Sequence, residues 1–225
     1  MRKTVQITYI LKKEFPNLHF SEKTVSLFEK YFEILEQWNK KINLTAIIDP
    51  EQMITKHLLD SLVVYNTSIG QSLMTLPSSS LLDLGSGAGI PGILLQISNP
   101  YLNVISIDKS QKKIGFQEYI KAKLELQNLE LLSERVETLM TRRIYEKSLD
   151  FIVSRAFVQI KDLFEYGRFF LKEHGYLILW KGAGWQDELK ATPDSLQIHF
   201  KLVESSTYQF KQTNFGGRIL VFRHT

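Results

Sequence analysis

The chain has 225 residues, of which 44% are hydrophobic and 23% charged, a composition typical of an ordinary globular protein. Cysteine is absent, which excludes disulfides and thiolate metal sites. The sequence contains no run of about 18 apolar residues, so no membrane span is predicted. A formal charge of +4 with a pI near 9.1 permits a polyanionic partner without requiring one.

From Met1 to about Gly70 the pattern is helical. Ser21 can cap a helix in which apolar residues recur every three or four positions. These residues are Val25, Phe28, Phe32 and Leu35, with Leu27, Tyr31 and Ile34 beside them. Asp49-Pro50-Glu51 marks a second helix start, with an Asp cap, a proline at the first position and an acidic first turn. The stretch Gly70–Ser80 then reads as a connection, because a proline and three serines interrupt the pattern.

Beyond this connection, short apolar runs alternate with helical segments. The runs predict buried strands at Leu81–Leu84, Val104–Ile107, Leu129–Leu132, Phe151–Val153 and Tyr176–Trp180. The predicted helices lie near Gly89–Ser98, Gln111–Leu126, Lys161–Leu171 and Trp185–Ala191. Such alternation predicts a parallel sheet that helices cover on both faces.

The end of the chain has a different pattern. Ile198–Phe210 and Arg218–Phe222 are rich in β-forming residues and flank a turn-like segment at 213–217, which predicts a closing antiparallel hairpin. A Rossmann-like α/β sheet with such a hairpin resembles the class I S-adenosylmethionine-dependent methyltransferases. We therefore expect an N-terminal helical extension at 1–75 and a methyltransferase domain at 76–225, packed as one globular unit.

The sharpest local signal is the glycine-rich segment DLGSGAGIPG at 83–92, between a predicted strand and a predicted helix. Glycines there allow a tight turn and let a ligand approach the backbone at the strand end and the helix N-terminus. The pattern D-x-G-x-G-x-G is that of S-adenosylmethionine sites, so we expect Gly85, Gly87 and Gly89 to form a cofactor loop. Asp108, at the end of the second strand, can accept hydrogen bonds from both ribose hydroxyls of an adenosine.

Two other interpretations of this loop stay open. A glycine-rich turn can bind nothing, and Asp108 would serve a nicotinamide dinucleotide as well as S-adenosylmethionine. A nicotinamide-dependent oxidoreductase would, however, have the third glycine of the pattern G-x-G-x-x-G where this chain has Ile90.

Four segments resemble a narrower family, the RsmG (GidB) guanine-N7 methyltransferases of small-subunit ribosomal RNA. In chain order they are WNKKINLT at 38–45, HLLDSL at 57–62, the glycine loop, and SRA at 154–156. The resemblance extends over most of the chain. It implies an enzyme that transfers a methyl group from S-adenosylmethionine to N7 of a guanine in the 530 loop of 16S rRNA, position 527 in the usual numbering.

The same resemblance assigns cofactor contacts to individual residues. Gly85 and Ile90 would contact the cofactor, and Val136 and Glu137 would flank its adenine. Arg155 would reach the cofactor from the end of the fourth strand, where α/β enzymes place their active sites, and is the candidate for a catalytic role. Ile90 stands where members often have Phe or Leu, and Val136 replaces a smaller residue.

Guanine N7 carries a free in-plane lone pair, so its methylation releases no proton at the attacking atom and needs no general base. The enzyme has to align nitrogen, methyl and sulfur. His57 and Asp60 lie on one helix face, and the sequence favours a buried polar pair over a place at the substrate mouth. Asn39 and Asn43 are better interpreted as caps and turn bonds than as base readers.

Several basic residues are candidates for contacts with RNA. The foremost are Lys109, Lys112, Lys181 and Arg218. Lys113, Lys121, Lys123, Arg142 and Arg143 are further members of a possible basic rim, although such charges are usually solvated helix faces. A rim of this kind would make RNA binding depend on salt.

The expected partner is 16S rRNA or the small ribosomal subunit. The absence of cysteine and of a signal peptide at Met1–Lys13 predicts a cytoplasmic protein, and we expect a monomer that needs no metal. The alternative from another class is a non-catalytic RNA-binding assembly factor that keeps a cofactor fold.

Overall fold

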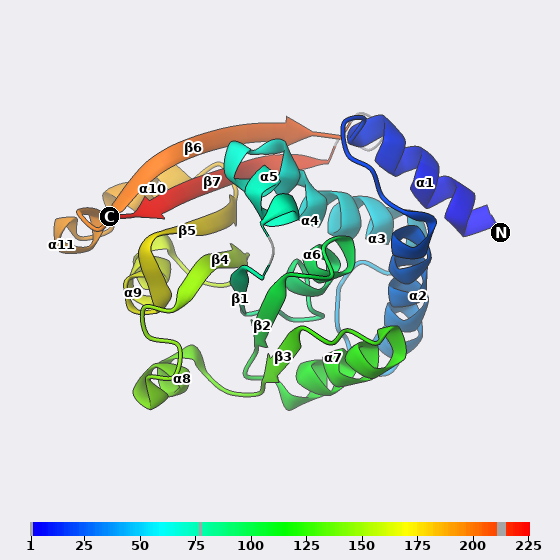
Figure 1. Ribbon diagram of the computed structural model, residues 1–225, viewed down its shortest axis with the longest axis horizontal. Helices are drawn as coiled ribbons and strands as arrows, with labels where there is room; N and C mark the ends of the chain where they lie inside the picture. Colours follow the sequence, from blue (N-terminus) through cyan, green and yellow to red (C-terminus); the bar gives the residue numbers. More distant parts are fainter. Residues whose placement is uncertain (1, 77, 211–214) are drawn as a thin grey trace.

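The computed structural model describes residues 2–76, 78–210 and 215–225, which form a seven-stranded sheet with helices on both sides (Figure 1). The strand order is β3-β2-β1-β4-β5-β7-β6. The strands are β1 (Ser80–Leu84), β2 (Asn103–Ile107), β3 (Leu129–Leu132), β4 (Leu149–Arg155), β5 (Leu171–Lys181), β6 (Phe200–Gln209) and β7 (Gly216–His224). All five predicted inner strands are confirmed, most of them slightly longer than predicted.

The sheet is parallel from β3 to β5, and β7 then runs antiparallel to both β5 and β6. This confirms the predicted closing hairpin; part of its turn, 211–214, lies outside the described residues. The chain order reverses between β1 and β4, since β2 and β3 lie on one side of β1 and β4 and β5 on the other. Ligands of open α/β sheets bind at such a switch point, beyond the carboxyl ends of the strands.

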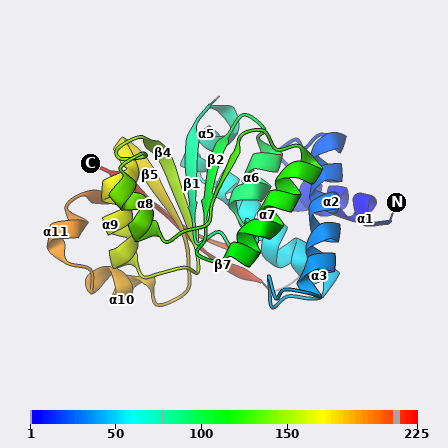
Figure 2. The same cartoon turned by 90° about the horizontal axis from the view of Figure 1, so that it is seen from below.

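Alternate residues of the strands point to opposite faces and build two separate cores. Leu81 and Val153 belong to the larger core, whereas Leu82 and Ile152 belong to the smaller one. Helices of the sheet domain cover these cores: α6 (Gly92–Ser98), α7 (Gln111–Leu124), α8 (Val136–Arg142), α9 (Ile160–Phe170), α10 (Trp185–Lys190) and α11 (Asp194–Gln197). Figure 2 shows α6 and α7 on one face and α8, α9 and α10 on the other. Both faces are therefore buried, as a parallel sheet requires.

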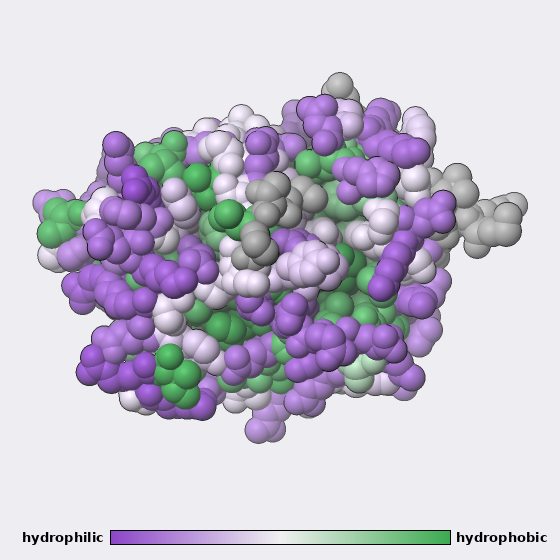
Figure 3. Space-filling model, viewed as in Figure 1, coloured by the Kyte–Doolittle hydropathy of each residue, from purple (hydrophilic) through white to green (hydrophobic). Residues whose placement is uncertain are grey.

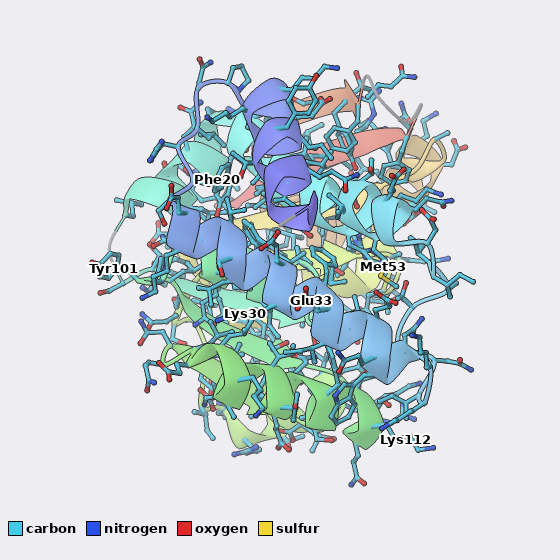
Figure 4. All side chains as sticks on the ribbon, turned by 90° about the vertical axis from the view of Figure 1, so that its right-hand side faces the viewer. Phe20, Lys30, Glu33, Met53, Tyr101 and Lys112 are labelled. Carbon is cyan, nitrogen blue, oxygen red and sulfur yellow. The ribbon has the colours of Figure 1, made fainter. Side chains whose placement is uncertain are left out.

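In the described part of the chain before β1, the extension consists of seven helical segments. They are α1 (Arg2–Glu14), α2 (Glu22–Asn39), α3 (Pro50–Met53), the π-helix η1 (Ile54–Leu59), α4 (Asp60–Leu62), the 3₁₀-helix η2 (Val63–Asn66) and α5 (Ser68–Thr75). Both predicted helix starts are confirmed, because Ser21 Oγ accepts from Thr24 N at 3.1 Å and Asp49 Oδ1 accepts from Gln52 N at 2.8 Å. Figure 4 shows α2 crossing between α1 and α7.

One expectation about local structure was wrong, and one helix at the site was missed. The first part of the predicted connection Gly70–Ser80 is helical, because Thr67 caps α5 through its hydroxyl at 2.9 Å from Gly70 N. Gly70 marks a close approach: a Cβ there would lie 1.8 Å from Val64 O. Helix α8 was not predicted at all, since its seven residues include only a few apolar positions.

The extension and the sheet domain share the larger core. Phe28 and Leu62 of the extension are fully buried in the same cluster as Leu81 and Ile178 of the sheet. The surface seen in Figure 3 is mostly hydrophilic, with hydrophobic side chains lying in hollows between the polar ones. Among the helices of residues 2–76, 78–210 and 215–225, none has the length and apolar character that crossing a bilayer requires.

Candidate active site at the carboxyl ends of β1, β2 and β4

The glycine loop joins β1 to α6 and has the left-handed backbone that its glycines allow. Gly85, Gly87 and Gly89 have φ values of 69°, 59° and 80°. An L side chain is strained at such angles, so the three glycines are required by the turn itself. Gly85 N and Ser86 N each donate to Ile107 O at 3.0 Å, which fixes the loop to the end of β2.

A cavity of about 430 Å³ opens beside this loop, within the range of small-molecule sites. Four of the predicted cofactor residues line it: Gly85, Asp108, Val136 and Glu137. Gly87, Gly89, Ile90 and Arg155 are not part of its lining. The structure therefore brings together the expected ribose and adenine contacts, and gives the other two glycines the role of shaping the loop.

Asp108 links the loop to the cavity. Its Oδ2 accepts from Gly87 N at 3.0 Å, its Oδ1 accepts from Ser110 N at 2.9 Å, and Lys113 Nζ lies 3.8 Å away. Each carboxylate oxygen can accept more than one hydrogen bond. Asp108 can therefore stay bonded to the backbone and still accept from two ribose hydroxyls.

Val136 and Glu137 begin α8 on the opposite wall of the cavity. Val136 is buried and gives that wall an apolar patch. Glu137 Oε1 accepts from Tyr166 Oη at 2.6 Å, and this hydrogen bond lowers the pKa of the Glu137 carboxyl. The carboxylate is thus ionised and fixed in place at neutral pH.

Phe157, which sequence reasoning missed, covers the loop from the side of β4. A Cβ on Gly85 would lie 2.2 Å from Phe157 Cδ2, so the ring packs directly on this glycine. The ring is 40% exposed. Its segment is fastened by Lys181 Nζ, which donates to Val158 O at 3.0 Å and to Glu188 Oε2 at 2.7 Å.

Asp83, the acid of the motif, lies buried behind the loop. Its Oδ2 accepts from Gly92 N at 2.8 Å, while its Oδ1 is buried without a hydrogen-bond partner. Burial raises the pKa of Asp83 to about 7. Asp83 does not line the cavity, but its Oδ1 is an acceptor without a donor among the described residues directly behind the glycine loop. Together with Asp108, which can accept from a ribose, it fits a ligand that carries both an ammonium group and a ribose, as S-adenosylmethionine does.

Gln117 of α7 is a second residue that sequence reasoning missed. Fully buried, it donates from Nε2 to Ser86 Oγ at 2.8 Å and to Gly87 O at 2.9 Å. Its Oε1 accepts from Ser106 Oγ at 2.6 Å. The only available signal was a polar residue among the apolar positions of α7.

Arg155 ends β4, but its guanidinium contacts the helical extension. Nη1 donates to Asp60 Oδ2 at 2.9 Å and to Lys56 O at 3.0 Å, and Nη2 lies 3.2 Å from His57 Nδ1. His57 and Asp60 are each 4% exposed, so they form the buried pair that the sequence favoured. Burial, together with the charge of Arg155, lowers the pKa of His57 to about 3.

The turn bonds expected of Asn39 are confirmed. Its Oδ1 accepts from Leu44 N at 2.7 Å and Thr45 N at 2.9 Å, and its Nδ2 donates to Thr45 O at 2.9 Å. Asn43 is exposed. Phe28 and Phe32, apolar positions of the predicted helix after Ser21, are buried.

Some of the basic residues proposed to contact RNA are exposed to solvent, whereas others already contact groups of the chain. Lys109 and Lys112 are exposed near the start of α7, and Figure 4 shows Lys112 projecting from that end. Lys113 follows on the same turn, whereas Lys121 and Lys123 lie at the opposite end of the helix, away from the cavity. A rim that includes all five lysines was therefore a wrong expectation.

The remaining cations already have partners in the chain. Arg142 pairs with Glu134 at 2.6 Å and Arg143 with Glu146 at 2.5 Å. Lys181 is fastened as described above, and Arg218 donates to Ser205 Oγ at 2.7 Å while its guanidinium lies over the Trp185 ring. These charges are partly neutralised or positioned by the protein itself.

The profile of a family described as rRNA small subunit methyltransferase G matches residues 24–215. A protein of that name from Methylobacillus flagellatus is 44% identical over 161 residues, 72% of this chain and 73% of the relative. One from Lactococcus lactis subsp. cremoris is 36% identical over 182 residues, 81% of this chain and 75% of the relative.

Solved structures agree at the level of the fold. An S-adenosylmethionine-dependent methyltransferase from Aquifex aeolicus aligns with a TM-score of 0.55 at 16% identity, covering 84% of this chain and 98% of that one. TrmN from Thermus thermophilus aligns with a TM-score of 0.52 at 18% identity, covering 69% of this chain and 48% of that one. The sheet with its terminal hairpin is therefore a class I methyltransferase sheet.

Proposed function

Since the chain belongs to the rRNA small subunit methyltransferase G family, we propose that it transfers the methyl group of S-adenosyl-L-methionine to N7 of a guanine in 16S ribosomal RNA. The guanine at position 527 of the 530 loop is the proposed acceptor. The observation that carries the proposal is the cavity in which Gly85, Asp108, Val136 and Glu137 meet at the switch point of the sheet.

Residues of the cavity lining and of the glycine loop and strand behind it would divide the work of holding the cofactor. Asp108 would accept from the ribose, Val136 and Glu137 would border the adenine, and the unpartnered Oδ1 of Asp83 would accept from the amino group. Ile90 would add an apolar contact from the loop. When bound, the cofactor supplies an activated methyl group on a sulfonium.

The protein's own contribution is alignment and exclusion of water. The bound cofactor would supply its methyl group to the lone pair of guanine N7 and leave as S-adenosylhomocysteine, so that the positive charge would pass to the purine and no proton would have to leave the nitrogen. A site without a general base is sufficient for this reaction, and holding the reacting atoms in line can supply several kcal/mol. We assign this alignment to Phe157 and Arg155, the side chains at the end of β4.

The RNA would approach the face that carries the start of α7. Lys109 and Lys112 are exposed there, and Lys109 also lines the cavity. Lys181 and Arg218, on neighbouring strands β5 and β7, would serve RNA only by giving up their present contacts. We further infer that the protein acts as a monomer in the cytoplasm on 16S rRNA or on the small subunit.

The test is methyl incorporation from labelled S-adenosylmethionine into naked 16S rRNA and into 30S subunits, followed by mass mapping. The expected product is N7-methylguanosine at position 527, absent from a strain that lacks this protein. Persistence of the mark in that strain would overturn the assignment of the substrate. RNA affinity without incorporation would instead favour a non-catalytic assembly factor, and binding of NAD alone would favour an oxidoreductase.

A further inference from the structure

Three groups of the helical extension hold the guanidinium of Arg155. Lys56 O and Asp60 Oδ2 accept from Nη1, and His57 Nδ1 accepts from Nη2. An arginine side chain carries five N–H donors. Among the bonds of the described residues this leaves one donor on Nη2 and the donor on Nε, on a side chain that is 20% exposed. Two donors thus remain available to a ligand at the carboxyl end of β4.

The contact with Arg155 fixes the tautomer of His57. Arginine can only donate, so Nδ1 must be the acceptor and the ring proton must sit on Nε2. Nε2 lies 2.9 Å from Thr45 Oγ1, which can accept that proton's hydrogen bond. The backbone of Thr45 is in turn held by the side chain of Asn39. One ring nitrogen of His57 therefore contacts Arg155, and the other contacts Thr45 of the extension.

Asp60 is fixed as firmly from the other side. Its Oδ1 accepts from Tyr208 Oη of β6, and its backbone oxygen accepts from Trp180 Nε1 of β5 at 2.7 Å. The carboxylate faces the guanidinium across a 2.9 Å ion pair in which Asp60 is almost completely buried. Such a pair is geometrically demanding, because each partner left alone would be a costly buried charge.

The backbone that presents these groups is itself unusual. His57 lies inside the π-helix η1, and Asp60 begins α4 directly after it. Single π turns within α-helices occur frequently at functional sites. Here the turn delivers a carbonyl, an imidazole and a carboxylate to one guanidinium within five consecutive residues.

We propose that His57 and Asp60 are positioning residues for Arg155, holding its guanidinium in a single orientation so that its two remaining donors are directed at the bound cofactor. The helical extension then acts on the cofactor site through Arg155, although neither Arg155 nor any described residue of the extension is part of the cavity lining in the ligand-free chain. Anchoring before the ligand arrives reduces the ordering that binding has to impose on a long side chain. The inference rests on the proposed function in one respect, namely that Arg155 serves S-adenosylmethionine.

Two substitutions of His57 distinguish a role in positioning Arg155 from a purely structural role within the extension. The side-chain oxygen of His57→Asn takes about the place of Nδ1 and can still accept from Arg155, but it loses the bond to Thr45. His57→Gln carries its amide to about the place of Nε2, which keeps the bond to Thr45 and loses the one to Arg155. A positioning role predicts a Kd for S-adenosylmethionine within about threefold of wild type for Asn and about tenfold weaker for Gln.

Calorimetry with S-adenosylmethionine and thermal unfolding of the same samples are the measurements. His19→Gln, on an exposed histidine of the extension, is the matched control and should leave both unchanged. The reverse order of the two His57 variants, or an equal loss of affinity in both, overturns the proposal. If the ranking follows melting temperature instead of the contact with Arg155, His57 is a structural tie only.

Asp60 is tested through its coupling to Arg155, since its direct replacement leaves a buried guanidinium unpaired and can unfold the chain. Tyr208→Phe removes only the phenol that holds the carboxylate, and we expect about threefold weaker cofactor binding. In an Arg155→Gln background the same change should have no further effect, because residues that act through one another are not additive. An undiminished effect there overturns the role of Asp60.

These outcomes differ from those of the proposed function. A wild-type protein that binds S-adenosylmethionine but methylates no RNA refutes the proposed reaction and leaves the positioning of Arg155 intact. A protein that methylates 16S rRNA, with His57→Gln binding the cofactor as tightly as wild type, refutes the positioning alone.

Discussion

The helical extension and the sheet domain approach the glycine loop with different kinds of contact. From the sheet domain, backbone N–H groups and short acidic side chains surround the loop, as Asp83 and Asp108 do with Gly92 and Gly87. From the extension, long buried side chains reach across, such as Tyr31, whose hydroxyl donates to Ala88 O at 2.7 Å. The first kind of contact is local and follows from the motif. The second exists only when the two parts are packed together.

The largest expected effect tests whether the two parts unfold together. Phe28 of α2 and Phe164 of α9 are both fully buried, one in each core. Replacement of either by Ala should lower the free energy of unfolding by about 3–5 kcal/mol. Hydrogen exchange followed by mass spectrometry should show both regions opening together in both variants. Faster exchange confined to residues 2–75 in Phe28→Ala would show instead that the extension is a separate unit.

The next largest effect is expected for cofactor binding by a residue of the sheet domain. Asp108→Ala should weaken binding of S-adenosylmethionine about tenfold or more, because hydrogen bonds to a charged acceptor contribute about 1.5–3 kcal/mol each. Asp150→Ala is the control, since Asp150 pairs with Lys172 near the amino ends of β4 and β5, at the end of the strands away from the cavity. An unchanged Kd by calorimetry would remove Asp108 from the site.

The dependence of stability on pH also distinguishes the two parts of the molecule. Asp83 of the sheet domain and His57 of the extension are buried groups whose pKa values are shifted in opposite directions. Folded Asp83 keeps its proton up to a pKa of about 7, whereas its ordinary pKa is 3.8. Unfolding therefore releases a proton between these values, and raising the pH lowers the free energy of unfolding by up to about 1.4 kcal/mol per pH unit. In Asp83→Asn, stability relative to wild type should rise from pH 4 to 7.

The lowered pKa of His57 has the opposite effect on the free energy of unfolding. Folded His57 stays neutral down to a pKa of about 3, whereas the unfolded side chain takes up a proton below its ordinary pKa of 6.5. Lowering the pH through this window therefore destabilises the wild-type protein. In His57→Asn, stability relative to wild type should rise as the pH falls from 6.5. Denaturant titrations at several pH values measure both differences, and parallel curves for wild type and variants would refute the two shifts.

The smallest effect concerns surface charge. Lys112→Ala should reduce the slope of log affinity for a 16S rRNA fragment against log salt by about 0.7–0.9 if its ammonium contacts one phosphate. Arg143→Ala is the control, because Glu146 already pairs with that guanidinium. Equal slopes for Lys112→Ala and wild type would place the RNA elsewhere.

Sequence reasoning located the strands and the glycine loop because their signals are local. Apolar runs such as Leu81–Leu84 are long enough to identify as strands, and the spacing of Gly85, Gly87 and Gly89 corresponds to three left-handed positions in one turn. It failed at Gly70, where a glycine marks close packing and the helix continues, and at α8, which is too short for its periodicity to show.

For the candidate site, the sequence indicated which residues lie near the glycine loop better than it indicated which groups they contact. Arg155 was expected to reach the cofactor, and the structure shows it bonded to Asp60 and His57, nearly a hundred positions earlier in the chain. Phe157 gave no signal and Gln117 only a weak one, because an aromatic after a strand and a glutamine in a helix are common. Their contacts with the loop depend on the packing of α7 and β4 against β1.

The amino-acid sequence by itself determined the fold class, the glycine loop and the position of Asp108 beside it, since each depends on residues within one strand and its following turn. Tertiary structure alone decided which of the described cations have partners, which oxygen of Asp83 lacks a donor among the described residues, and how the extension holds Arg155. The physical reason is that partners of buried polar groups must come from wherever packing brings a complementary group, and spacing along the chain does not encode that.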